Sequence, residues 1–121
     1  MVMTNQQLLT KMDDHITAIG ASMATQMNNQ SLCQIQKDGR ITGGLKYDEG
    51  RLETLQTFRR LIAEHLEQSP ELIYAEVMRR EAQLEKFQQQ SRPSIQWLAY
   101  WSGAVEMAHE ILAWMDSSRA L

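Results

Sequence analysis

The residues whose types and spacing best fit a chemical role are Glu106 and His109, which stand three positions apart with Glu110 beside them. On a helix this spacing presents a carboxylate and an imidazole to one metal ion, as in four-helix carboxylate proteins. Such a site needs a second Glu-x-x-His pair, and neither His15 nor His65 follows an acid at that interval. We therefore expect no metal and no cofactor here, and a solvated polar stripe instead.

Three further acids, Glu76, Glu81 and Glu85, invite comparison with the clustered carboxylates that hold magnesium against substrate phosphates in helical nucleotide pyrophosphohydrolases. The five-residue interval from Glu76 to Glu81 rotates the two side chains well away from each other on a helix. The chain also has no Gly-rich phosphate loop and no serine or cysteine paired with histidine in a recognisable nucleophile pattern. We therefore predict that the protein is not an enzyme.

Two arginine pairs are the best candidates for binding an anion. They are Arg59, Arg60, Arg79 and Arg80. If the helices that carry them form an antiparallel hairpin, the pairs lie at similar levels and can grip a phosphate or carboxylate through bidentate hydrogen bonds. The alternative, which we favour, is that Glu64 and Glu76 neutralise them in surface ion pairs.

The overall charge limits the kind of partner. Fifteen acidic and twelve basic residues give a formal net charge of −3, so no global positive field attracts nucleic acid. A nucleic-acid-associated regulator that uses the arginine cluster is one alternative function. A small metal-binding or enzymatic helical bundle centred on Glu106 and His109 is another.

Composition also indicates the compartment. The one cysteine, Cys33, cannot pair within the chain, as in cytosolic proteins. The N-terminus lacks the pattern of a signal peptide, and no apolar run reaches the roughly 18 residues of a membrane span. We expect a cytoplasmic protein with no membrane contact.

Apolar spacing of three and four residues predicts four helices in one all-α domain, residues 1–121. Their expected ranges are 4–27, 46–67, 70–90 and 94–117, with a loop over 28–44. A short β-hairpin near residues 32–42 is an alternative to an irregular loop. The short link before Pro70 predicts an antiparallel hairpin of the second and third helices, so we expect a small helical bundle.

The last predicted helix, 94–117, is apolar around most of its circumference. Either the other three helices enclose it, or a second copy of the chain covers part of it. We favour the second copy, with a homodimer as the simplest assembly. The expected self-association residues are Trp97, Trp101, Val105, Ala108, Leu112 and Met115.

A short pattern occurs twice: Tyr47-x-x-Gly50-x-x-Glu53 returns as Tyr100-x-x-Gly103-x-x-Glu106, 53 residues further along the chain. One interpretation is a duplicated helical hairpin. The other, which we favour, is that a glycine within a helix costs up to about 1 kcal/mol relative to alanine and is kept where two helices approach closely. We predict that Gly50 and Gly103 both mark close helix crossings.

One segment resembles short sequences found in small uncharacterised helical proteins encoded by phages and prophages. It is Gly43-Gly44-Leu45-Lys46-Tyr47-Asp48-Glu49-Gly50-Arg51-Leu52. This resemblance implies an accessory protein of a mobile element, and it supplies no catalytic residues. Together with the features above, it leads to the hypothesis of a non-enzymatic, oligomeric helical protein that binds another protein. In a phage this would be an assembly factor or an adaptor directed at the host.

Overall fold

The chain folds as a small bundle of four helices. The structure is a computed structural model and describes residues 4–29, 44–65 and 69–119. Within these residues the helices are α1 (Asn5–Asn29), α3 (Leu45–Glu64), α4 (Ser69–Gln88) and α5 (Ile95–Arg119), and there is no strand. The predicted all-α bundle is therefore confirmed. The β-hairpin considered near residues 32–42 lies outside the described part of the chain.

Local capping explains where two of the helices begin. Thr4 and Gln7 bond reciprocally, because the Gln7 amide N donates to the Thr4 hydroxyl at 3.0 Å and the Thr4 amide N donates to Gln7 Oε1 at 2.8 Å. The Ser94 hydroxyl accepts a hydrogen bond from the Trp97 amide N at 3.3 Å at the start of α5. These side chains satisfy amide groups that have no partner inside a first helical turn.

Two helices end earlier than the sequence predicts. The helix expected over 46–67 stops at Glu64, since His65 already has a non-helical backbone and Ile62 is the last buried residue before it. The helix expected over 70–90 stops at Gln88, because exposed polar residues follow it without apolar surface to bury. Without such burial, a further helical turn gains little from packing.

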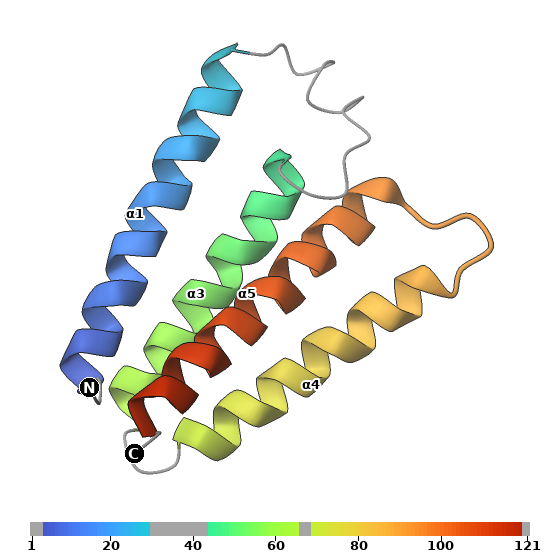
Figure 1. Ribbon diagram of the computed structural model, residues 1–121. Helices are drawn as coiled ribbons and strands as arrows, with labels where there is room; N and C mark the ends of the chain where they lie inside the picture. Colours follow the sequence, from blue (N-terminus) through green and yellow to red (C-terminus); the bar gives the residue numbers. More distant parts are fainter. Residues whose placement is uncertain (1–3, 30–43, 66–68, 120–121) are drawn as a thin grey trace.

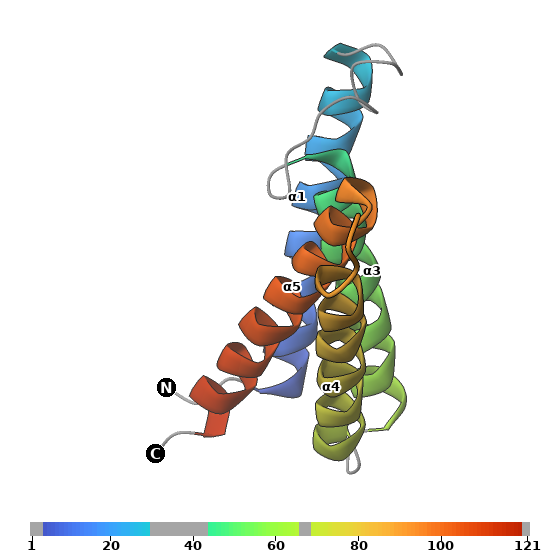
Figure 2. The same ribbon diagram turned by 90° about the vertical axis from the view of Figure 1, so that its right-hand side faces the viewer.

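Successive helices alternate in direction, so that α3 and α5 run the same way and α1 and α4 run opposite to them (Figure 1). The α3–α5 pair has the most extensive contact in the molecule, with α1 packed on α3 and α4 packed on α5. Helices α3 and α4 form the predicted antiparallel hairpin, but their direct contact is small. Helix α4 stands at one edge of the bundle in Figure 1 and therefore lies in front in Figure 2.

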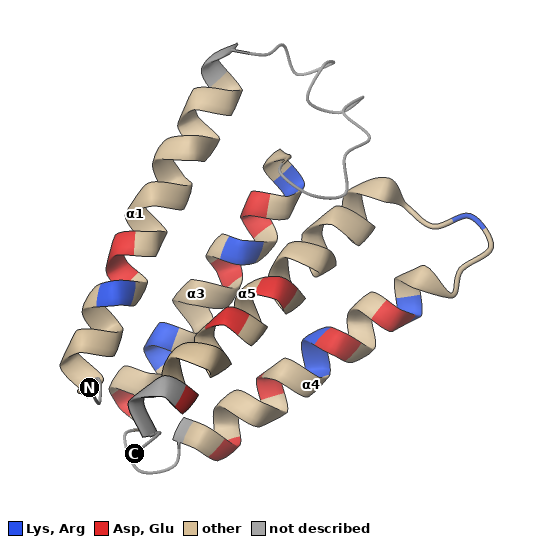
Figure 3. Cartoon of the chain, in the orientation of Figure 1, with Lys and Arg blue, Asp and Glu red and all other residues tan. Residues whose placement is uncertain are grey.

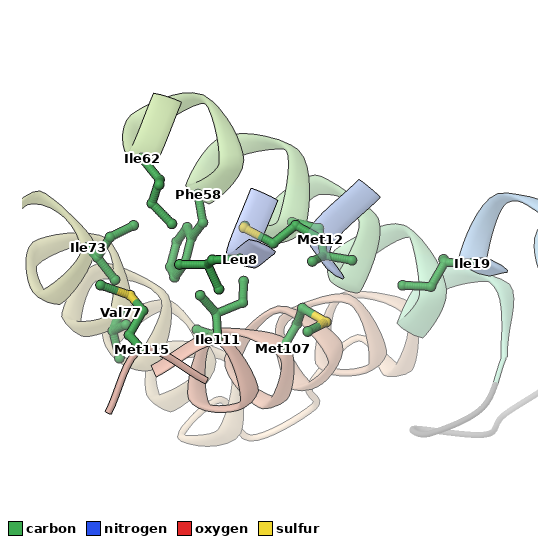
Figure 4. Close-up of a cluster of buried hydrophobic side chains, with 12 residues drawn as sticks. Leu8, Met12, Ile19, Phe58, Ile62, Ile73, Val77, Met107, Ile111 and Met115 are labelled. Carbon is green, nitrogen blue, oxygen red and sulfur yellow. The ribbon is translucent and has the colours of Figure 1, made fainter. Parts of the chain in front are cut away.

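All four helices contribute to one hydrophobic core (Figure 4). Leu8 and Met12 of α1 meet Phe58 of α3, while Ile73 of α4 and Ile111 of α5 close the cluster from the other side. Each of these five side chains is buried. No helix of the described residues combines the length and apolarity that a membrane crossing requires.

Candidate interaction surfaces

Gly50 and Gly103 lie at the contact between the two central helices. A Cβ added to Gly50 would lie closer than 3.0 Å to the carbonyl oxygen and carbon of Tyr100, and a Cβ added to Gly103 would lie closer than 3.0 Å to the carbonyl oxygen of Tyr47. The contact is reciprocal, because each glycine faces the backbone of the tyrosine that belongs to the other copy of the pattern. Only glycine allows the α3 and α5 backbones to approach this closely.

The correspondence between α3 and α5 continues beyond the glycines. Adding 53 to the number of each buried residue of α3 from Gly50 onward gives a buried residue of α5. The pairs are Gly50 with Gly103, Thr54 with Met107, Leu55 with Ala108, Phe58 with Ile111, and Ile62 with Met115. Helices α3 and α5 therefore bury corresponding positions on the same side of the glycine crossing, and each of them packs against one outer helix, α1 on α3 and α4 on α5.

Arg80 is the largest fully buried side chain, with no exposed surface. Its guanidinium donates to both carboxylate oxygens of Glu53 at 2.9 Å, to the Thr54 hydroxyl at 3.0 Å and to the Glu76 carboxylate. It also lies 5.0 Å from the centre of the Phe58 ring. This network connects α4 to α3, and it satisfies a charge that would otherwise be costly to bury.

The four arginines do not form the cluster considered from the sequence. Arg59 turns toward α1, where its Nε and Nη2 donate to the Asp13 carboxylate at 2.5 and 3.1 Å. Arg79 pairs with Glu76 at 3.0 Å, Arg60 is exposed, and Arg80 points into the core. The shared anion site, which was the less favoured alternative, does not form, because the four side chains leave α3 and α4 on different faces. Glu76 pairs with Arg79 and Arg80, as the favoured interpretation expects for this acid.

The charge on Glu76 gives the fold a defined sensitivity to acid. Burial would raise the pKa of this carboxyl, but hydrogen bonds from Arg80 and Arg79 outweigh burial and lower the pKa below its ordinary value of 4.5. A lowered folded-state pKa means that the ion pairs stabilise the protein fully above about pH 4.5 and that this contribution is lost as the pH falls through the folded-state pKa.

We therefore expect urea midpoints to fall with pH below about 4.5. We also expect the variant Glu76→Gln to show a shallower fall than the wild type over that range. The variant Glu85→Gln, which changes another exposed acid of the same helix, is the control. If the urea midpoint of Glu76→Gln fell with pH as steeply as that of the wild type, the loss of stability in acid would not come from this carboxyl.

The side chains of the Glu106, His109 and Glu110 stripe divide between two neighbouring helices. Arg51 of α3 pairs with Glu110 at 2.6 Å and with Glu106 at 3.4 Å, whereas His109 Nε2 lies 3.0 Å from Glu81 of α4. Burial and a hydrogen bond to Glu106 raise the pKa of nearby Tyr47 to about 12, so its phenol stays protonated at neutral pH. Over the described ranges, no group of three His, Cys, Asp or Glu side chains is arranged to hold a metal ion.

The surface of α5 expected to bind a second copy is largely occupied within the chain. Ala108 and Met115 are buried in the core, and Trp101, Val105 and Leu112 are half-buried. The prediction of an accessible face was wrong for Ala108 and Met115, because α3 and α4 pack along α5 and α1 reaches its C-terminal half. The α1 contact includes His15, whose ring lies 4.7 Å from the ring of Trp114.

Aromatic rings gather where α4 ends and α5 begins. Phe87 stacks on Trp97 with ring centres 6.1 Å apart, Trp97 meets Tyr100 edge-on at 5.6 Å, and Tyr100 meets Trp101 edge-on at 5.0 Å. Lys46 of α3 places its Nζ 5.8 Å from the Trp97 ring. Trp97 nevertheless keeps 46% of its surface exposed. We call Phe87, Trp97, Tyr100 and Trp101 the aromatic cluster.

Comparison of the chain with protein-family models, with curated proteins and with solved structures gives no match.

Proposed function

We propose that this chain is a non-enzymatic, oligomeric protein of the cytosol that acts by binding another protein through the α4–α5 hairpin. The observation that carries the proposal is the distribution of exposed large apolar side chains. Among the described residues these are Met27, Tyr74, Met78, Ile95 and Trp97, and four of the five belong to α4 or α5. Exposed apolar side chains held on rigid helices are typical of protein contact sites.

The contrast between the two hairpins strengthens this proposal. The seam between α1 and α3 is closed by polar contacts, namely the Asp13–Arg59 pair and a hydrogen bond of 2.6 Å from the Gln26 amide to Asp48. At the positions of α5 that correspond to Asp48 and Arg59 stand Trp101 and Leu112, both half-buried. The two hairpins thus have similar helix packing, but α5 carries apolar side chains where α3 carries charged ones. This difference favours a binding role for the α4–α5 hairpin.

The aromatic cluster is the part of this hairpin best suited to anchor a partner. Its rings are held by one another and by two helix ends, so Trp97 loses little conformational freedom on binding. Tryptophan and tyrosine are enriched among residues that dominate interface energetics. The resemblance of residues 43–52 to phage and prophage proteins supports an assembly factor or host-directed adaptor as the setting for this role.

Site-specific photo-crosslinking tests the proposal. We expect a photoreactive phenylalanine analogue in place of Trp97 to give covalent protein adducts in the native cells, because the exposed ring would lie at the partner surface. The same analogue in place of Gln56, which is exposed on α3, is the matched control and should give none. Mass spectrometry of the adducts identifies the partner, and equal labelling from both positions would contradict the proposal.

A further inference from the structure

The outer face of α4 offers a continuous surface at the edge of the bundle. Its residues Glu71, Ala75, Met78, Ala82 and Lys86 are all exposed and follow one another at intervals of four, three, four and four. This spacing places them along one side of the helix. Figure 2 shows α4 in front, with no other helix over this side. We call these five residues the α4 outer face.

The α4 outer face has Met78 and two alanines in its middle, Glu71 near its start and Lys86 near its end. Figure 3 shows that acidic and basic residues occur along the whole of α4. One of them, Arg79, pairs with Glu76 of the same helix. Met78 is 69% exposed, and Tyr74 beside it is 47% exposed. Ala75 and Ala82 flank Met78 with small side chains that let another helix come close. The exposed side of the first half of α1 carries Thr10, Asp13 and Thr17, which are polar where the middle of α4 carries Met78.

The charges at the two ends make the face complementary to itself. In an antiparallel pair of α4 helices that cross between Met78 and Arg79, Glu71 of each copy meets Lys86 of the other, and Ala75 meets Ala82. A parallel pair would instead bring Glu71 against Glu71 and Lys86 against Lys86, which is unfavourable. The sequence of the face therefore matches a second copy of this chain in antiparallel orientation.

We propose that two copies of this chain associate through the α4 outer face, with α4 antiparallel to α4 of the partner and Met78 at the centre. This inference specifies the oligomer within the proposed function and rests on it for the idea of self-association. It replaces the α5 surface predicted from the sequence, where Ala108 and Met115 are buried. The dimer leaves the exposed Trp97 ring outside the α4 outer face for a different protein.

Light scattering combined with sedimentation over a concentration series tests the dimer. We expect a wild-type mass of twice the 14.0 kDa of one chain. Met78→Lys should weaken the dimer at least about 100-fold, because this register places position 78 of each copy opposite Arg79 of the other and like charges then meet at the centre of the contact. Either Glu71→Lys or Lys86→Glu alone should weaken it about tenfold, since each single change creates two like-charged pairs.

The decisive variant combines both reversals, Glu71→Lys with Lys86→Glu. The pairs are then exchanged rather than broken, and we expect dimerisation to return to near the wild-type level. If the single variants act only by weakening helix α4 itself, the double variant should be the least stable of the three. An acid near the start and a base near the end stabilise a helix, and the double variant reverses both. If the double variant dimerised as weakly as either single variant, the proposed pairing of Glu71 with Lys86 of the other copy would be wrong.

Two further outcomes separate this inference from the proposed function. A wild-type monomer at all concentrations would overturn the dimer, while protein adducts from position 97 would still support a partner. A dimer that survives Met78→Lys but dissociates in Trp101→Glu would place the contact on α5 and overturn the α4 assignment. Circular dichroism of each variant shows whether the bundle remains folded.

Discussion

Replacing Gly50 with alanine should destabilise the protein by about 3 kcal/mol or more, although alanine is the better helix former by about 1 kcal/mol. The added methyl group would collide with the backbone carbonyl of Tyr100 rather than with a side chain that can rotate away. Relief therefore requires α3 and α5 to separate along the most extensive contact of the fold. Urea unfolding followed by circular dichroism measures the loss.

Gly20 provides the matched control for this prediction. It also lies within a helix, but nothing approaches within 4 Å of the position that its Cβ would occupy. Gly20→Ala should therefore stabilise the protein by up to about 1 kcal/mol. If both substitutions changed the free energy of unfolding equally, the close α3–α5 crossing would be wrong.

The same crossing predicts how two substitutions combine. Gly103→Ala should be as costly as Gly50→Ala, because its methyl group would meet the carbonyl of Tyr47. Once either change has moved the helices apart, the second collision is partly relieved. The double variant should then lose less stability than the sum of the two single losses, as expected for residues in contact.

The sequence predicts the helices well because their signals are local. Apolar spacing gives the four elements, Pro70 and Pro93 mark two starts, and the reciprocal Thr4–Gln7 bond was readable from two residue types. The repeated Tyr-x-x-Gly-x-x-Glu pattern predicted where helices cross closely. It could not predict that the two copies face each other, because that depends on how the complete bundle assembles.

It is harder to predict which residues lie on the surface, because exposure depends on how the helices pack against one another. The apolar circumference of α5 is equally compatible with enclosure by its own bundle and with contact to a second copy. The structure shows that α1, α3 and α4 take up most of it. The sequence did not predict that Met78 is exposed on α4. A methionine that shares a helix face with Ala75 and Ala82 is as common in a hydrophobic core as on a surface.

Arg80 is the residue whose role was most clearly missed. Arginine is rarely fully buried, so its type alone argued for the surface. A signal was nevertheless present, since Ile73, Val77, Arg80 and Leu84 follow at intervals of four, three and four and so share the inward face of α4. The partners could not be read locally, because Glu53 and Thr54 come from another helix.

Removing both carboxylates from Arg80 should therefore destabilise the protein more than removing the arginine itself. In the double variant Glu53→Gln with Glu76→Gln, a guanidinium with no exposed surface keeps its charge without a counter-ion. The expected loss is about 3 to 5 kcal/mol, the range for a buried ion pair that loses one partner. Unfolding by urea near pH 7 measures it.

Arg80→Met is the contrasting variant, because methionine fills much of the same space without a charge. Glu53 and Glu76 both retain exposed surface through which water can solvate their carboxylates, so the main remaining cost is the Thr54 hydroxyl left without its donor. We expect a loss of only about 1 to 2 kcal/mol, the cost of leaving a buried hydroxyl without its partner, because exchanging a buried ion pair for an apolar residue of similar volume is often close to neutral. If Arg80→Met were the more destabilising variant, the ion pairs themselves would be a major source of stability. The expected order would mean that the ion pairs add little net stability, and that the two carboxylates are needed chiefly because the buried arginine is there.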